Sequence, residues 1–336
     1  MNKWILYLSV ILAMSSGLAQ AHLDEGKAEG KCAQVEALHL AAEQGDANAQ
    51  NNLGELFLHG EGVTQDTSEA VKWFQLAAKQ GLANAQFNLG VSYGNGQGIA
   101  QDYQEAVKWF RSAAEQGHTK AQFSLAISYA NGQGVIQSFE EAIKWFRLAA
   151  EQGDTVSQYT LGGIYLDGKI VAQNYQEADK WLHLAAKQGH AKAQFNLGVT
   201  YGNGQGATQN FQEAVKWFRL AAEQGHAKAQ YYLGLSYANK QGINQDYQEA
   251  VKWFRLAAKQ GNAAAQNSLG LSYELGQGVT QDYVRAHTWL DLATVNGKSD
   301  AQANRGKVAQ RMTPVQIAEA QKLARDCKKI HYTNCE

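Results

Sequence analysis

Proline is almost absent from this chain, which has a single proline, Pro314, among its 336 residues. Because proline interrupts helices, its absence before that position permits an uninterrupted helical array. Only three cysteines are present, too few for the disulfide-dense framework of small secreted domains. An excess of one charge is lacking too, since 30 Lys and Arg residues stand against 31 Asp and Glu residues. This balance argues against sequence-independent binding of nucleic acid, which needs a broad basic field.

A long apolar run is confined to the N-terminus. Lys3 supplies a positive charge, residues 4–14 form a short apolar core, and residues 19–21 are a small-x-small cleavage site. The sequence therefore predicts a signal peptide over residues 1–21 and a mature chain that begins at His22. The apolar run is too short to predict a membrane-spanning helix. We expect an exported product, periplasmic or secreted, with no integral membrane segment after signal cleavage.

The feature that the sequence does have is a repeat. Seven tryptophans recur at an interval of 36 residues: Trp73, Trp109, Trp145, Trp181, Trp217, Trp253 and Trp289. Self-similarity at this period is typical of solenoids, in which each unit buries its apolar face only by stacking on its neighbours. We predict an all-α fold, a right-handed superhelical α-solenoid of two-helix, 36-residue repeats.

The second copy shows how one repeat is built. Ala85, Leu89 and Tyr93 recur at a spacing of four and predict one face of a first helix. Asp102 precedes a second helix, and Glu105 three residues later predicts a capping box. The equivalent N-caps are Asp66, Asp102, Ser138, Asn174, Asn210, Asp246 and Asp282. Each second helix is expected to end at a left-handed glycine: Gly81, Gly117, Gly153, Gly189, Gly225, Gly261 and Gly297.

These residues carry a family resemblance. The second copy reads Ala85-Gln86-x-x-Leu89-Gly90-x-x-Tyr93-x-x-Gly96-x-Gly98, then Asp102-x-x-x-Ala106-x-x-Trp109-x-x-x-Ala113-Ala114-x-x-Gly117. This pattern resembles the Sel1-like repeat, a relative of the tetratricopeptide repeat with a longer loop between its helices. The resemblance covers Ala47 to Gly297 in seven consecutive copies. It implies a bacterial scaffold that binds protein partners, and departures such as Lys240 in place of a loop glycine affect loop shape alone.

The domain organisation follows from the repeat. We expect a signal peptide (1–21), an N-terminal capping helix (22–45), seven Sel1-like repeats (46–297), and C-terminal capping helices with a tail (298–336). In the last segment Thr313-Pro314-Val315-Gln316 predicts a helix start, with Thr as the N-cap and Pro at the first helical position. Terminal repeats of solenoids need such covers to stay soluble.

The cysteines lie at the two ends of the predicted array. Cys327 shares a helical face with Leu323, and the turn-like segment 332–334 brings Cys335 back toward it. We therefore predict a disulfide between Cys327 and Cys335 in an oxidising compartment. Cys32 is left over, either as a small buried side chain or as an intermolecular link.

Two features suggest chemistry and are better explained as turns. The glycine-rich segment 94–98 follows no predicted strand, and the carboxylate of Asp102 after it would repel phosphate. His118, His190 and His226 follow repeat glycines, but equivalent positions of adjacent repeats lie about 10 Å apart. One zinc ion needs its ligands at about 2 Å. We predict no metal site and no cofactor.

The sequence also lacks a catalytic constellation. A cysteine-rich branch of this repeat family is labelled β-lactamase, but the motifs Ser-x-x-Lys, Ser-Asp-Asn and Lys-Thr-Gly are absent from this chain. The chain also lacks the cysteine pair that this branch has within each repeat. We predict no catalytic residue and no enzyme activity.

A polar surface lies opposite the apolar face of the first helices. Stacked repeats normally present these helices along the concave side, where asparagine amides can donate to and accept from the backbone of an extended peptide. We predict partner recognition by Asn88, Asn131, Asn196, Asn203, Tyr232 and Asn239. Ordinary solvated polar side chains are the alternative explanation.

The predicted function is that of an exported, non-catalytic and monomeric scaffold or adaptor. It binds protein or peptide partners on its concave face, in envelope processes or host interaction, and binds no nucleic acid. One alternative is an envelope hydrolase of the β-lactamase-labelled branch. Another is a glycan-binding module in which the ring of Tyr232 stacks on sugars.

Overall fold

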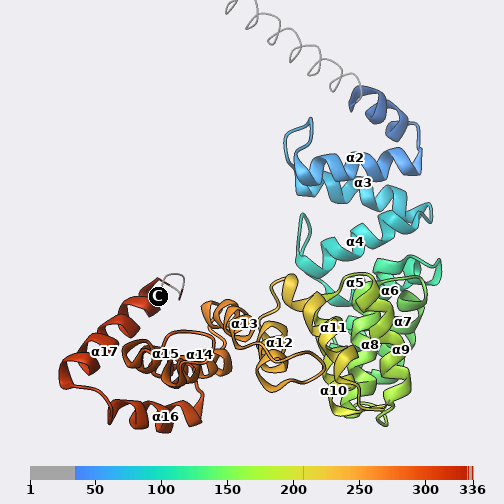
Figure 1. Cartoon of the computed structure of the whole chain (residues 1–336). Coiled ribbons are helices and arrows are strands. Elements are labelled where there is room, and N and C mark those ends of the chain that lie inside the picture. The colour runs from blue at the N-terminus through green and yellow to red at the C-terminus, as the bar shows by residue number, and fades with distance from the viewer. Residues whose placement is uncertain (1–34, 207, 331, 333–334, 336) are drawn as a thin grey trace, which may run out of the picture. The chain divides into compact units, whose positions relative to one another are not determined.

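A computed structural model describes residues 35–330 except residue 207, together with Tyr332 and Cys335. This part of the chain contains helices and no strand, so the all-α prediction is confirmed (Figure 1). The predicted signal peptide and Cys32 lie outside the described residues. None of the described helices is both long and apolar enough to span a bilayer. Two compact units make up the chain, Met1–Gln152 and Gly153–Glu336, and each is described by itself.

The first unit is a series of helix pairs, preceded by helical residues 35–43. The pairs are α2 (Ala47–His59) with α3 (Thr67–Lys79), α4 (Ala83–Asn95) with α5 (Tyr103–Glu115), and α6 (Thr119–Asn131) with α7 (Phe139–Glu151). We call the first helix of each pair helix A and the second helix B. Each helix B packs against its own helix A, and α3 and α5 also pack against the helix A that follows.

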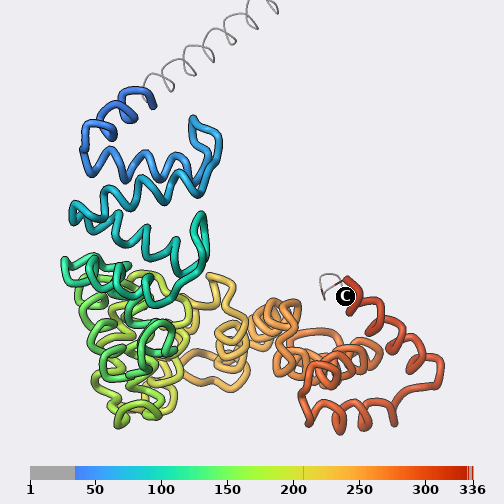
Figure 2. Tube along the Cα trace, turned by 180° about the vertical axis from the view of Figure 1, so that it is seen from behind, coloured from blue at the N-terminus to red at the C-terminus, as the bar shows by residue number. Residues whose placement is uncertain are grey.

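The second unit continues the same alternation, as the tube in Figure 2 shows. Its pairs are α8 (Thr155–Asp167) with α9 (Tyr175–Lys187), α10 (Ala191–Asn203) with α11 (Phe211–Glu223), α12 (Ala227–Asn239) with α13 (Tyr247–Lys259), and α14 (Ala263–Leu275) with α15 (Tyr283–Val295). Two further helices, α16 (Ser299–Ala309) and α17 (Pro314–Lys329), both pack against α15. The structure thus confirms helix pairs that repeat about every 36 residues.

All seven predicted N-caps of the B helices accept hydrogen bonds from the first turn. The predicted capping box at Asp102 is wrong in one respect: the Glu105 side chain does not accept from the backbone N–H of Asp102. One carboxylate oxygen of Asp102 accepts from the backbone N–H groups of both Gln104 and Glu105, at 2.9 and 3.1 Å. The Glu105 side chain pairs with Lys108 instead, because this lysine lies one turn further along the same helix face.

The ends of the B helices also follow the prediction. The seven glycines have φ between 78° and 93°, which is the left-handed region that glycine enters without steric cost. The backbone therefore reverses at the same point in every copy, and the next helix A starts two residues later. This shared geometry keeps the copies in register.

Small residues let helices A and B of one repeat approach closely. A Cβ on Gly90 of α4 would lie 2.6 Å from Cδ1 of Phe110 on α5, closer than any real Cβ contact. The third copy has Ala126 at this position. There the ring of Phe146 makes an angle of 59° with that of Phe123, compared with 38° for the equivalent rings of the second copy. Rotation of the ring accommodates the added methyl group.

A glutamine closes each loop between helices A and B. Gln101 Nε2 donates to the backbone oxygen of Gly94 at 2.7 Å. The same bond across seven residues is made by Gln65, Gln137, Gln173, Gln209, Gln245 and Gln281. In the second copy this loop lies against the preceding repeat, since a Cβ on Gly98 would lie 2.0 Å from the backbone oxygen of Thr67. The loops therefore contribute to contacts between repeats.

Candidate partner-binding surface

The six residues predicted to bind a partner occupy two positions of the repeat. Asn88, Asn196 and Tyr232 lie in the middle of helices α4, α10 and α12. Asn131, Asn203 and Asn239 are the exposed last residues of α6, α10 and α12. Two of the six lie in the first unit, and the other four lie on successive A helices of the second unit.

In two copies the middle position joins its helix to the helix A before it. Asn88 Nδ2 donates to Asn51 Oδ1 at 3.0 Å and to Glu55 Oε1 at 3.1 Å. The same offset of 37 residues separates Asn304 from Asn267, whose side chains are hydrogen bonded at 3.0 Å. Part of the polar surface is therefore used for contacts between repeats, a role that the sequence analysis did not assign.

A hollow lies beside Asn88 in the first unit. It has a volume of about 490 Å³ and is lined by Glu55, Asn84, Phe87, Asn88, Gly117, His118, Thr119 and Lys120. The lining comes from three successive A helices, or from the turns directly before them. It combines an aromatic ring, amide groups, a carboxylate and an ammonium group. Such a mixture suits a polypeptide segment, which presents backbone amides as well as side chains.

Tyr232 differs from every other copy at its position. The other six repeats have Asn52, Asn88, Ser124, Thr160, Asn196 and Ser268, and helix α16 has Asn304 at the equivalent position. The Tyr232 side chain is 39% exposed, and its ring lies 5.6 Å from that of Phe195 and 5.3 Å from that of Phe218. The second unit therefore presents one exposed aromatic side chain at this point, packed on two more buried rings.

The three histidines before the A helices are caps. Nδ1 of His118, His190 and His226 accepts from the backbone N–H three residues later, at 3.1 to 3.2 Å. Burial, and then a nearby lysine, lowers the pKa of each histidine below its ordinary value. An unprotonated Nδ1 is what the cap needs. Within the described part of the chain, no three His, Cys, Asp or Glu residues form a group that could hold a metal ion.

Buried glutamines connect successive repeats, and the sequence analysis gave them no role. Gln86 Nε2 donates to the backbone oxygen of Ala78 in the preceding helix B, and its Oε1 accepts from Gln116 at the end of its own helix B. The same position holds Gln50, Gln122, Gln158, Gln194, Gln230 and Gln266, all at most 4% exposed. The recurrence of glutamine at this position in every copy, after serine in the fourth copy and after alanine in the others, was the signal for this network.

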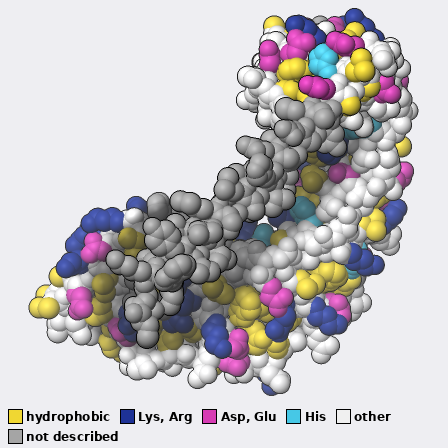
Figure 3. All heavy atoms as spheres, turned by 90° about the horizontal axis from the view of Figure 1, so that it is seen from above, with side chains coloured by type: hydrophobic (Ala, Val, Ile, Leu, Met, Phe, Trp, Pro, Cys, Tyr) yellow, Lys and Arg dark blue, Asp and Glu magenta, His cyan; other side chains and the backbone are white. Residues whose placement is uncertain are grey.

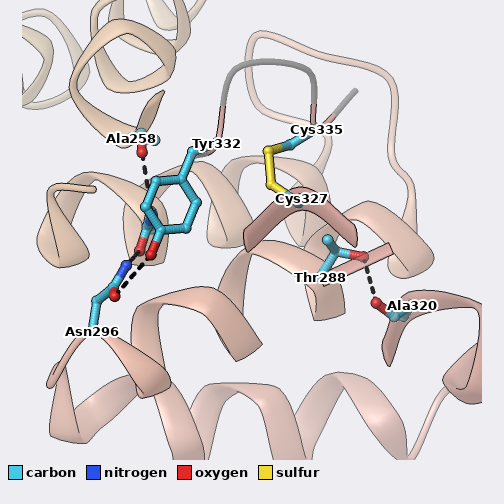
Figure 4. The surroundings of a disulfide bond; sticks show 8 residues. Ala258, Thr288, Asn296, Ala320, Cys327, Tyr332 and Cys335 are labelled. Atoms are coloured by element: carbon cyan, nitrogen blue, oxygen red, sulfur yellow. Dashed lines mark hydrogen bonds between the residues drawn. A yellow bond between two sulfur atoms is a disulfide. The ribbon is translucent and has the colours of Figure 1, made fainter. Parts of the chain in front are cut away.

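The C-terminal tail ends this network in the second unit. Cys327 and Cys335 form a disulfide with a Cα–Cα distance of 5.1 Å (Figure 4). Within the loop that it closes, Tyr332 Oη donates to Asn296 Oδ1 at 3.1 Å. Asn296 in turn donates to Gln266 Oε1 at 2.9 Å. The hydroxyl of Tyr332 is thus linked through Asn296 to Gln266, the last glutamine of the series.

The repeat architecture matches a known family. The model of the Sel1 repeat matches residues 47–82, 83–118, 119–154, 155–190, 191–226, 227–262 and 263–294. The chain belongs to the Sel1 repeat family. Sel1 repeat proteins are generally non-catalytic scaffolds for protein interaction. No curated protein matches the chain in sequence.

The first of three similar solved structures agrees with this assignment. A Sel1 repeat protein from Oxalobacter formigenes is 34% identical, with a TM-score of 0.63 over 80% of this chain and 78% of that one. The protective antigen c5321 of uropathogenic Escherichia coli is 30% identical over 90% of this chain and 80% of its own, with a TM-score of 0.46. The immunity protein Pa5087 from Pseudomonas aeruginosa is 20% identical over 65% of this chain and 83% of its own, with a TM-score of 0.35.

Proposed function

We propose that this Sel1 repeat protein is an exported, non-catalytic adaptor that binds extended peptide segments of a protein partner along its A helices. The observation that carries this proposal is the hollow beside Asn88, which crosses three successive repeats. An extended peptide in it meets the ring of Phe87, the amide of Asn84 and the ammonium group of Lys120. Solenoids commonly use such surfaces because neighbouring repeats present equivalent side chains side by side.

Export is supported by two features of the chain. The N-terminal charge, apolar core and small-x-small site fit a signal peptide. The disulfide between Cys327 and Cys335 fits an oxidising compartment, since cytosolic thiols are normally kept reduced. We place the mature protein in the periplasm or outside the cell.

Alanine substitution of the predicted residues tests the adaptor function. The partner is first identified by crosslinking in the native cell and then purified. We expect the combined variant N88A/N131A/N196A/N203A/Y232A/N239A to lose at least tenfold in affinity for it, because roughly 1.4 kcal/mol of lost contacts suffices. The matched control is Q104A/Q248A on the B helices, which should bind as the wild type does. Unchanged affinity of the six-residue variant, with its thermal midpoint intact, would remove this assignment.

Glycan binding is a second candidate because Tyr232 presents an exposed ring where other copies have small polar residues. Sugars stack on such rings, and a Tyr232→Asn variant carries the residue that three other repeats already have there. Binding to a glycan array that disappears in this variant would support the second candidate. Array binding that is absent in the wild type would rule it out.

A further inference from the structure

The B helices of the second unit carry a leucine at one shared position. Leu184 on α9, Leu220 on α11 and Leu256 on α13 are 39%, 44% and 46% exposed. The fourth member, Leu292 on α15, is only 2% exposed. We call Leu184, Leu220 and Leu256 the outer leucine row. The leucine at this position is thus exposed in three successive repeats and buried in the fourth.

Helix α17 is what covers the fourth position. A following helix A is present in all four cases, as α12 after α11 and α16 after α15, so it cannot account for the difference. Only α15 also has α17 packed against it. Thr288, one turn before Leu292, donates from Oγ1 to the backbone oxygen of Ala320 in α17 at 3.2 Å. Ala324 and Cys327 of α17 belong to the same buried cluster as Leu292.

The sequence of α15 is adapted to this contact. Thr288 stands where α11 and α13 have Lys216 and Lys252, both largely exposed, and Val284 stands where α13 has Gln248. The outer face of α15 therefore carries no charge one turn before the leucine, whereas the other B helices keep a lysine there. A helix that docks on the other copies must meet both the leucines and these lysines.

We propose that the outer leucine row binds an amphipathic α-helix of a partner protein. The partner helix presents small side chains at a spacing of three to four, as α17 does with Ala320, Ala324 and Cys327, and lies over Lys216 and Lys252, which are already paired with Glu213 and Glu249. The α15–α17 contact is the template, because the chain itself places a helix on this face where its lysine is replaced. Small side chains bring the partner backbone close enough for the leucines to fill the space between helices.

The row differs from ordinary scattered surface leucines. Single exposed apolar side chains are common on soluble proteins, whereas this row places an exposed leucine at the same position of three successive B helices. In the first unit the equivalent series is Leu76, Ser112 and Leu148, so a serine interrupts it. The uninterrupted series belongs to the second unit and leads directly to the position that α17 covers. On the face seen in Figure 3, charged side chains of both signs are mixed with hydrophobic ones.

A peptide copied from α17 tests the proposal in trans. The probe is a fluorescent peptide of residues 313–329 with Cys327→Ala, added to the full, oxidised chain, and binding is followed by anisotropy. We expect saturable binding that weakens at least tenfold in the variant L184S/L220S/L256S. Serine is the matched replacement, because Ser112 occupies this position in a folded repeat. A peptide of the same composition in scrambled order should not bind.

Two further variants separate this surface from the others. The six-residue alanine variant of the A helices should bind the probe as the wild type does, so this proposal stands or falls independently of the proposed adaptor site. If the peptide instead bound to α15 by displacing the chain's own α17, the variant L184S/L220S/L256S would bind it as the wild type does. That result, or no saturable binding to the wild type, would overturn the proposal.

Discussion

Gln116 Nε2 lies 2.7 Å from Oε1 of Gln86, and this amide pair spans 30 residues of sequence. Gln86 at the same time donates to Ala78 O at 3.3 Å. One side chain therefore ties the end of the preceding helix B to the end of its own helix B. The bond to Ala78 O is buried and the bond from Gln116 is partly buried, so the loss of both weakens the contact between successive repeats.

Replacement of one buried glutamine should weaken the array. In Gln230→Leu the volume is nearly unchanged, but the hydrogen bonds of Gln230 to Ala222 O and from the amide of Gln260, at 3.1 and 2.8 Å, are lost. We expect the free energy of unfolding to fall by about 2 kcal/mol, since each lost hydrogen bond costs about 1 kcal/mol. Urea unfolding followed by circular dichroism measures the change. The control Gln248→Ala, on an exposed helix face, should stay within about 0.5 kcal/mol of the wild type; an equally small effect in Gln230→Leu would contradict the prediction.

Acidification should destabilise the chain through its histidine caps. Burial first, and then the charges of Lys120, Lys192 or Lys228, lowers the folded pKa of His118, His190 and His226 below the ordinary histidine value of 6.5. The unfolded chain therefore binds more protons between that value and the lower folded pKa. The stability that the three neutral histidines contribute is complete above pH 6.5 and is lost as the pH falls toward their lower folded pKa.

Asparagine substitution isolates this effect. Asn262 caps α14 by accepting from the Ala265 N–H, so H118N/H190N/H226N keeps a cap that does not titrate. We expect the variant to lose less stability than the wild type between pH 7.5 and 5.5. Unfolding midpoints measured at both pH values check this. Equal losses in the two proteins would show that the caps do not titrate as inferred.

The repeat period and the helix ends could be predicted from the sequence because they depend on local residues. The caps such as Asp102 and the left-handed glycines such as Gly117 act within one turn of their own position. The role of Gln86 could not be predicted in this way, since its partners lie 8 residues before and 30 residues after it, on two different helices. Asn88 shows the same limit: it bonds to Asn51, one residue more than a full period away.

Reduction of the disulfide should destabilise the second unit. The bond closes a short loop, and a loop of this size is expected to contribute about 2 to 3 kcal/mol by restricting the unfolded chain. The loop also places the Tyr332 hydroxyl on Asn296, a hydrogen bond worth about 1 kcal/mol. We expect dithiothreitol to lower the urea midpoint of the wild type but not that of C327A/C335A. Tyr332→Phe should cause a smaller decrease without a reductant, and no response of the wild type to reductant would refute the structural role of the bond.

Lys240 offers a stabilising substitution. It ends α12 with a φ of 59°, a left-handed conformation in which a Cβ atom crowds the following carbonyl oxygen. The other helices A end at this position with glycine, at φ between 68° and 73°: Gly60, Gly96, Gly132, Gly168, Gly204 and Gly276. Lys240→Gly should therefore raise the free energy of unfolding by about 0.5 to 1 kcal/mol, the steric relief being partly offset by the greater freedom of glycine in the unfolded chain. The converse change, Gly204→Lys, should lower it by a similar amount, and urea unfolding of both variants checks the pair. A Lys240→Gly protein less stable than the wild type would mean that the lysine side chain makes a contact which outweighs its backbone strain.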